Sequence, residues 1–322
     1  GCGSPSGSNS QNGEKPDSGT IRIGETVKIA YADQMRSGLD PNKTVWEQLS
    51  GGLDIIKLGA VDKDGRAVNG ALREVNSRAY CSWFNFSGAD QQKKVGVLSG
   101  GERNRLNLGM MIKTAANVLL LDEPLSNLDP KLRESMRFEI KELQKKFNFT
   151  IIFVTHDQSE AMALSDRMMV MDMGKIVQID TPRNLYNKPV NRFVHSFLGK
   201  STFVKVEIKD GKAYPDGDYS QAIPCRLPDD ASNGEKRFMA ARPNAINLNK
   251  SVGYKTKIEK RVFLTDCTEY YVKVGGQMLL VQTPHRVVFR QGEECRVDLV
   301  GVMWYKDDDK NSEEERARRQ LV

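Results

Sequence analysis

Two short, continuously apolar runs constrain the fold of this chain more than any other feature. They are "VLLL" at 118–121 and "TIIFV" at 150–154, and residues that favour turns bound both of them. Strands that are apolar on both faces are typical of parallel sheets, because helices cover both sides of such a sheet. Parallel neighbours also need a long crossover connection, and residues 122–149 can supply one. The pattern therefore predicts a strand–helix–strand unit of an α/β fold.

The connection between the two runs carries the signals of a helix. Asp129 can cap its first turn, and Pro130 has the backbone angle that suits the first helical position. Apolar residues then recur at helical spacing, at Leu132, Met136, Ile140, Leu143 and Phe147. A second helix is predicted over the run "ERNRLNLGMMIKTAAN", with Ser99 as its N-cap.

The residues ahead of these elements predict less regular structure. Segment 1–13 is almost wholly Gly, Ser, Asn, Gln and Pro, a composition that cannot bury a core, so we expect it to be flexible. The run "TIRIGETVKIAYADQ" at 20–34 predicts two short strands joined by a turn at Gly24. Irregular helices are predicted for residues 44–58 and 66–80, with a loop between them.

The second half of the chain changes character. The run "DRMMVMDMGKIVQID" predicts a hairpin that turns at Met173 and Gly174. After Gly199, short runs such as "FVKVEIK" and "QMLLVQT" alternate with turn residues. This spacing predicts a small all-β barrel or sandwich.

The composition excludes some classes of protein. No apolar run approaches the ~20 residues that a membrane-spanning helix requires, so membrane association would have to come through a partner. The five cysteines are far apart and include no C-x-x-C pair, which is typical of free thiols in a reducing compartment. The three histidines are too scattered to suggest a metal site. A net charge of +6 permits contact with phosphate or nucleic acid without requiring it.

Four motifs occur in a fixed order along the chain. They are "LSGGE" at 98–102, "LLLDEP" at 119–124, "SNLD" at 126–129 and "THD" at 155–157. Together they resemble the motifs of the ATP-binding-cassette (ABC) ATPases. The resemblance implies an α/β fold, the parallel sheet of a P-loop NTPase with a helical subdomain, and ATP and Mg²⁺ as cofactors.

The "LSGGE" motif opens a predicted helix. In the family this signature loop contacts the γ-phosphate of a nucleotide held by the opposite subunit, which implies a binding role for Ser99, Gly100, Gly101 and Glu102. The physical reason is that the N-terminus of a helix attracts anions, while glycines let the backbone approach closely.

The other motifs carry roles that the resemblance implies. Asp122 would hold Mg²⁺ through water, and Glu123 would polarise the attacking water. His156 would touch the γ-phosphate, and Asp129 would contact the subunit interface. Gln34, in "AYADQ", fits the glutamine loop of the family, which senses Mg²⁺ and the transmembrane partner.

One element of the family is not found. ABC ATPases hold phosphates with G-x-x-x-x-G-K-[ST], whose amides and lysine contact the phosphate oxygens. Nothing in the 322 residues matches it, and "GCG" at 1–3 is followed by Ser4 and Pro5 instead of Lys and Ser or Thr. We therefore expect an ABC cassette that is short of its front end and impaired in holding nucleotide.

The resemblance is to two branches of the family. Residues 14–124 resemble the second ATPase domain of ABC-F proteins, which are translation-associated and bind ribosomes. Residues 119–322 resemble the ATP-binding subunit of importers for sugars, polyamines or iron, in which a small OB-like β domain (the TOBE domain) follows the cassette. The switch falls inside "LLLDEP", which both branches share, and recombination, a join made in assembly and deliberate fusion all remain open. We expect a flexible segment at 1–13, followed by an incomplete ABC ATPase domain at 14–199 with its helical subdomain at 35–97. A TOBE-like β domain at 200–304 and a charged tail at 305–322 complete the expected parts.

Three functions follow from the resemblance. The first is the ATP-binding subunit of an ABC importer, cytoplasmic and peripheral to the inner face of the membrane, partnered by a second ABC ATPase subunit and a transmembrane permease. The second is an ABC-F-type translation factor that binds the ribosome. The third is a catalytically dead cassette that only completes a partner's site.

Overall fold

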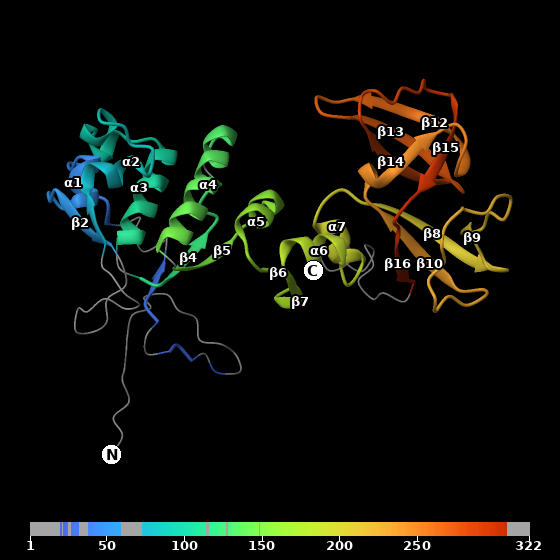
Figure 1. Cartoon of the computed structure of the whole chain (residues 1–322), viewed down its shortest axis with the longest axis horizontal. Helices are drawn as coiled ribbons and strands as arrows, with labels where there is room; N and C mark the ends of the chain where they lie inside the picture. Colours follow the sequence, from blue (N-terminus) through green and yellow to red (C-terminus); the bar gives the residue numbers. More distant parts are fainter. Residues whose placement is uncertain are drawn as a thin grey trace, which may run out of the picture. The chain divides into compact units, whose positions relative to one another are not determined.

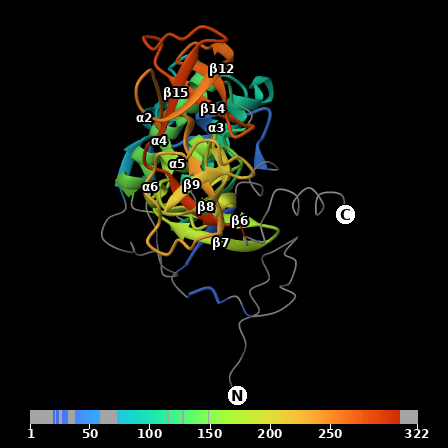
Figure 2. The same cartoon turned by 90° about the vertical axis from the view of Figure 1, so that its right-hand side faces the viewer.

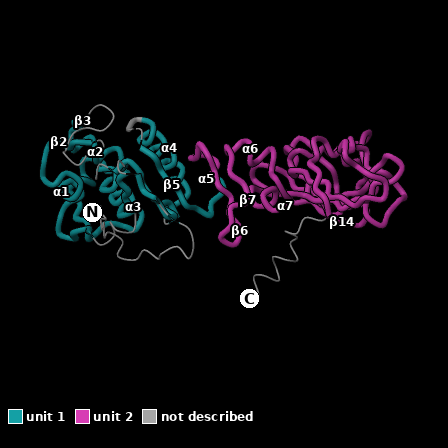
Figure 3. The backbone as a smooth tube through the Cα atoms, turned by 90° about the horizontal axis from the view of Figure 1, so that it is seen from below, with its two compact units in different colours: residues 1–160 teal, residues 161–322 magenta. Residues whose placement is uncertain are grey.

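The structure, a computed structural model, describes residues 20, 22–24, 27–31, 38–58, 73–113, 116–126, 128–147 and 149–307. The chain divides into two compact units, Gly1–Glu160 and Ala161–Val322 (Figure 1, Figure 3). The flexible segment predicted at 1–13 lies outside the described residues, as does most of the predicted charged tail. Unit 2 begins ahead of residue 200, and the predicted domain limits remain a prediction.

Unit 1 contains a three-stranded sheet in the order β1 (Ile29–Tyr31), β4 (Val118–Asp122), β5 (Thr150–Val154). Both pairings are parallel, which confirms the prediction from the two apolar runs. The turn predicted at Gly24 does not lead into a hairpin in the described residues, because β1 pairs with β4 instead. The main-chain carbonyl of Lys28 accepts the Val118 amide at 3.1 Å, so a partner distant in sequence replaces the local one.

Two long helices accompany this sheet, α3 (Gly100–Lys113) and α4 (Pro130–Phe147) (Figure 1). The predicted cap of α4 is confirmed, since Asp129 Oδ1 accepts the amide of Leu132 at 3.0 Å. The apolar stripe predicted on α4 is buried at Met136, Ile140 and Leu143. Ser99 and Glu102 form reciprocal bonds at the start of α3, which confirms the predicted cap there.

The segment between β1 and α3 mixes short helices with a strand pair. The elements are α1 (Val45–Ser50), β2 (Ile55–Leu58), β3 (Arg73–Asn76) and α2 (Ser77–Ser82), followed by the 3₁₀ turns η2 (Asp90–Gln92) and η3 (Val95–Val97). The prediction of helices at 44–58 and 66–80 is therefore wrong over β2 and β3, which pair antiparallel. Gly51, at a φ of +68°, ends α1, and burial then alternates along β2 with the period of a strand.

Gly109 holds α3 close to the helices around it. A Cβ at Gly109 would lie 2.8 Å from Leu49 Cδ2 and 3.2 Å from the ring carbons of Phe84. The Tyr80 hydroxyl donates to the Gly109 carbonyl at 2.6 Å. Leu49, Tyr80 and Phe84 are fully buried, so these neighbours have little room to move.

Unit 2 begins with a hairpin and two short helices. The hairpin pairs β6 (Met168–Asp172) with β7 (Lys175–Asp180), and the helices are α6 (Pro182–Asn187) and α7 (Arg192–Phe197). The turn lies at Met173 and Gly174, with φ values of +47° and +74°, which confirms the predicted hairpin. The remaining helix, α5 (Gln158–Leu164), spans the limit between the two units.

The rest of unit 2 is all-β, as predicted. One sheet has the order β16-β10-β8-β9 and the other β11-β15-β12-β13-β14; Figure 2 labels β8 and β9 of the first and β12, β14 and β15 of the second. The strands of the first sheet are β8 (Thr202–Lys209), β9 (Lys212–Pro215), β10 (Lys236–Ala241) and β16 (Met303–Lys306). Those of the second are β11 (Ile246–Asn249), β12 (Tyr254–Phe263), β13 (Thr268–Val274), β14 (Gln277–Thr283) and β15 (Glu294–Leu299). Val206 and Met239 of the first sheet and Tyr270 and Val281 of the second share one core.

Arg242, just after β10, holds the end of α7 to the β sheets. Its Nη1 donates to the carbonyl of His195 at 2.7 Å and to that of Gly199 at 3.1 Å. Its guanidinium lies 4.3 Å from the centroid of the Tyr186 ring. His195 is fully buried. Among the described helices, none has both the length and the apolar composition needed to span a bilayer.

A Gly109→Ala substitution tests the packing of unit 1. Alanine normally favours a helix interior over glycine, but here its methyl group would overlap buried neighbours, so we expect destabilisation by about 1–3 kcal/mol. Urea unfolding of unit 1, followed by Trp46 and Trp83 fluorescence in a Trp304→Phe background, would measure the change. Gly100→Ala is the matched control, because a Cβ there meets nothing within 4 Å. Equal midpoints for the two variants would contradict this account of the packing.

Candidate functional site

Asp122 and Glu123 stand where β4 ends. Asp122 is the last residue of the strand and pairs in register with Val154 of β5. The amide of Glu123 donates to the Val154 carbonyl at 2.9 Å, which extends the ladder by one residue. Glu123 has a backbone φ of +43°, which is uncommon for a residue other than glycine. Such strained backbone angles are concentrated at functional sites.

His156 lies two residues after β5 and meets Glu123. Its Nδ1 is 2.6 Å from Glu123 Oε1. The two side chains are 75% and 45% exposed, so the pair faces solvent and not the core. Parallel pairing of β4 with β5 brings both strand ends to the same edge of the sheet, and the acid and the imidazole meet there.

The electrostatics of this pair favour a protonated histidine. The hydrogen bond that the ring donates to Glu123, followed by the charge of the same carboxylate, raises the pKa of His156. Asp157 and Glu160 add to the effect with smaller contributions. A histidine stabilised in this way keeps its positive charge to a higher pH than an isolated one, which suits a residue that faces an anion.

The turn that carries His156 is fixed to α4 by charged side chains. Thr155 Oγ1 donates to Glu160 at 2.8 Å, and Asp157 caps α5 by accepting the Glu160 amide at 3.1 Å. From α4, Arg133 approaches Asp157 at 3.5 Å and Glu160 at 3.6 Å, and Arg137 approaches Asp157 at 3.6 Å. This network was not predicted from the sequence, although the spacing of Arg133 and Arg137, one helical turn apart, places both on one face of α4.

The "LSGGE" residues form the N-terminus of α3. The Ser99 amide donates to Glu102 Oε2 at 2.8 Å, and the Glu102 amide donates to Ser99 Oγ at 3.3 Å. A Cβ at Gly101 would lie 3.0 Å from Leu128, whereas one at Gly100 would meet nothing within 4 Å. Packing therefore explains the glycine at 101 and leaves Gly100 open on its surface.

The remaining predicted residues fall into two groups. Asp129 is exposed and its side chain caps α4, while its predicted role at a subunit interface stays a prediction. Gln34 lies outside the described residues. In the described part of the chain, no hydrogen bond or ion pair joins Ser99 or Glu102 to Glu123 or His156.

The carboxylate at the end of β4 suits a metal ion that is bound jointly by the protein and by a phosphate-bearing ligand. Across the residues that the structure describes, no group of three or more His, Cys, Asp or Glu side chains is arranged to hold a metal ion. Asp122 nevertheless offers an exposed carboxylate beside Glu123 at the end of β4. Mg²⁺ in nucleotide sites commonly binds one or two carboxylates together with phosphate oxygens and water, so a single acid is sufficient.

Comparison with known proteins gives two kinds of relative. Residues 6–126 match the family described as ABC transporter. The spermidine/putrescine import ATP-binding protein PotA of Pseudomonas fluorescens is 35% identical over 254 residues, 77% of this chain and 66% of the relative. The Fe(3+) ions import ATP-binding protein FbpC of Vibrio cholerae is 35% identical over 279 residues, 84% of this chain and 76% of the relative. The energy-dependent translational throttle protein EttA of Mycobacterium tuberculosis is 47% identical over 145 residues, 45% of this chain and 23% of the relative.

The extent of these similarities differs. The chain spans 66% of the length of this PotA, 55% of an FbpC from Photorhabdus laumondii and 23% of EttA. Similarity to the import proteins covers most of the chain, whereas similarity to EttA is stronger per residue and covers less than half of it.

A Glu123→Gln substitution is expected to lower the pKa of His156. The amide keeps the shape of the carboxylate but not its charge, so the imidazolium loses its largest source of stabilisation. An NMR titration of the His156 ring would measure the midpoint, which should fall relative to the unchanged chain. Glu134→Gln on α4 makes the same charge change without contacting His156, and its midpoint should not move. A midpoint that is the same in all three proteins would contradict the pairing.

Proposed function

The chain belongs to the ABC transporter family, and from that membership we propose that it is the ATP-binding subunit of an importer. The observation that carries the proposal is the meeting of Glu123 and His156 at the ends of β4 and β5, 2.6 Å apart. The extended similarity to import proteins and the all-β sheets of unit 2 support the importer branch.

The proposed ligand is ATP with Mg²⁺. Asp122 would hold the metal, which neutralises charge on the phosphates when it is bound. Glu123 would orient a water molecule, and the cationic form of His156 would face the γ-phosphate. Transfer of a phosphoryl group depends mainly on such positioning and charge stabilisation, so these few side chains are sufficient for the roles proposed.

The proposed site is completed by a second ABC ATPase subunit. Gly100 leaves the backbone at the start of α3 open, and a helix of this length offers amides and a dipole to an anion. We propose that Ser99, Gly100, Gly101 and Glu102 face the nucleotide of that subunit, with Asp129 at the interface. The same proposal gives Gln34 a role in sensing Mg²⁺ and the permease.

We also propose that ATP hydrolysis by these 322 residues alone is impaired. They contain no G-x-x-x-x-G-K-[ST] sequence, so the backbone cradle and lysine that hold phosphates in the family are not supplied by them. Each missing charge-assisted contact is worth about 1.5–3 kcal/mol. In the strongest form of this proposal, the cassette hydrolyses no ATP itself and only completes its partner's site.

The proposed partner is a transmembrane permease, which would hold the chain at the inner face of the cell membrane. The proposed domains are the cassette at 14–199, with 35–97 as the part nearest the permease, and a TOBE-like domain at 200–304. The second candidate is a ribosome-associated factor of the ABC-F type. It is favoured by one observation, the 47% identity to EttA over 145 residues.

Fractionation of cells distinguishes these partners. The chain is expected to be recovered with membranes when the permease subunits of a polyamine or iron(III) importer are co-expressed, and not in their absence. Sedimentation with ribosomes, independent of the permease and resistant to a high-salt wash, would instead support the ABC-F candidate and contradict the importer proposal.

Turnover measurements test the proposed impairment. The isolated chain and its Glu123→Gln variant are expected to release phosphate from MgATP at the same background rate, because neither holds the phosphates in place. A rate for the unchanged chain that exceeds the variant by tenfold or more would show a working site and overturn the proposed impairment.

A further inference from the structure

Unit 2 exposes a stacked pair of aromatic rings at the end of β12. The centroid of the Phe263 ring lies 4.3 Å from that of the His285 imidazole, and the angle between the two ring planes is 25°. His285 covers one face of the phenyl ring, yet Phe263 is 66% exposed. The other face of this ring is therefore open to a further flat ring.

Hydrogen bonds hold the imidazole in this position. Its Nδ1 lies 3.1 Å from the hydroxyl of Thr268, which is buried, and its Nε2 lies 3.3 Å from the carbonyl of Thr265. Thr268 is also the cross-strand partner of Phe263 on β13. The stack is thus formed by the folded chain itself, and a ligand that uses it does not have to order it first.

Two arginines flank the stack. Arg261 is exposed and lies two residues before Phe263 on β12, so both side chains leave the same face of the strand. Arg286 is exposed and follows His285 directly. In the described part of the chain neither guanidinium forms an ion pair, and the ion pairs of β12 and its neighbouring strands are made by lysines. Both arginines are therefore available to an anion.

The loop that follows His285 extends this surface along β12. Its Gly292 amide donates to the Ile258 carbonyl of the strand at 2.8 Å. Arg290 is exposed and lines a shallow hollow of about 450 Å³ there. Glu293 lines it too, but its carboxylate is paired with Lys250 at 2.9 Å. Since a strand rises by about 3.4 Å per residue, this hollow and the aromatic stack are about 17 Å apart along β12.

These features select a ligand that has both flat rings and regularly spaced negative charges. An open aromatic face binds nucleobases by stacking, and the planar guanidinium of arginine suits phosphate oxygens. An acidic peptide offers the charges without the bases. In a duplex the bases stack on one another, whereas in a single strand they can turn toward a protein surface.

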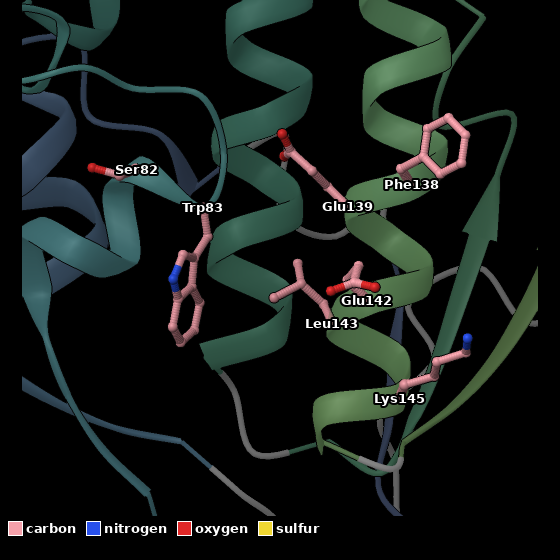
Figure 4. A pocket seen from close by; sticks show the side chains of 7 residues that line it. All are labelled: Ser82, Trp83, Phe138, Glu139, Glu142, Leu143 and Lys145. Carbon is pink, nitrogen blue, oxygen red and sulfur yellow. The ribbon is translucent and has the colours of Figure 1, made fainter.

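Exposure of a phenylalanine does not create such a surface by itself. Phe138 of α4 is 70% exposed, and Figure 4 shows Glu139 and Glu142 on the same helix beside it. All three line a hollow of about 620 Å³ in unit 1. Carboxylates at this place repel phosphates, so Phe138 provides a matched control for Phe263.

We propose that a single-stranded nucleic acid binds to unit 2 at the surface formed by Arg261, Phe263, His285, Arg286 and Arg290, the β12 face. One base stacks on the open side of the Phe263 ring, and the phosphates next to it contact Arg261 and Arg286. The strand then continues along β12 toward Arg290. The β12 face contains none of the ATPase motifs, so this proposal is independent of the proposed function.

Fluorescence anisotropy of labelled oligonucleotides of about 12 nucleotides, titrated with the whole chain, tests the proposal. We expect saturable binding of oligouridylate or oligothymidylate at about 0.15 M salt without ATP, and the tighter of the two shows whether RNA or DNA is preferred. The same strand paired with its complement is expected to bind at least tenfold more weakly. Polyglutamate of equal charge is expected to be an equally poor competitor.

Substitutions of Phe263 test the stacking. Phe263→Leu keeps an apolar side chain but removes the flat ring, so we expect binding to weaken at least fivefold with unchanged circular dichroism. Phe263→Tyr keeps the ring and is expected to bind within about twofold of the unchanged chain. Phe138→Leu, the same change at an equally exposed position, is expected to have no effect.

Substitutions of charged residues test the phosphate contacts. Arg261→Gln is expected to weaken binding and to reduce the slope of log affinity against log salt by about 0.7, the value for one phosphate contact on a single strand. Asp266→Asn, which removes an exposed acid from the turn after β12, is expected to strengthen binding. Arg183→Gln changes an exposed arginine of α6 and is expected to leave both affinity and slope unchanged.

Several results would overturn the proposal. The first is the absence of saturable binding for both oligonucleotides, and the second is competition by polyglutamate as strong as that by the single strand. The third is that folded Phe263→Leu and Arg261→Gln bind as Phe138→Leu and Arg183→Gln do. The fourth is weaker binding by Asp266→Asn than by the unchanged chain.

Discussion

Glu123 takes its position from the ladder between β4 and β5, whose last hydrogen bond joins the Glu123 amide to the Val154 carbonyl at 2.9 Å. Because the two strands are parallel, their carboxyl ends reach the same edge, and the residues that follow them must share it. His156 follows β5 by two residues and so meets the acid. An antiparallel pairing of the same strands would send these two side chains to opposite edges, and the candidate site would not exist.

The crossover that parallel pairing demands also supports the site. α4 returns the chain from the end of β4 to the start of β5, and its Arg133 and Arg137 reach Asp157 and Glu160 in the turn beyond β5. Exposed ion pairs contribute little individually, but Glu160 is almost fully buried and gathers several donors. The turn that carries His156 is therefore held by α4, the crossover helix that the parallel pairing of β4 with β5 requires.

The sequence predicted those elements of the fold that depend on residues close together in the chain. The apolar runs of β4 and β5, the caps of α3 and α4 and the Met173–Gly174 turn all depend on neighbours in sequence, and the structure confirms them. β1 could not be placed in this way, since the ladder that holds it pairs Ile29 with Val118, 89 residues away. The sequence pattern predicted helix over β2 and β3, because a short apolar segment such as that of β2 fits both periods and β3 contains only one apolar residue, Val75. The candidate site was predicted through the resemblance, while the Glu123–His156 contact arises from tertiary packing alone.

The most direct test of the juxtaposition at the sheet edge is a nuclear Overhauser measurement on selectively labelled protein. The account predicts a cross-peak between the ring protons of His156 and the side-chain methylenes of Glu123, together with interstrand cross-peaks in the parallel register from Leu119–Ile151 to Asp122–Val154. Interstrand peaks without the His156–Glu123 peak would contradict the site. Absence of the parallel-register peaks in folded protein would contradict the fold from which the site is built.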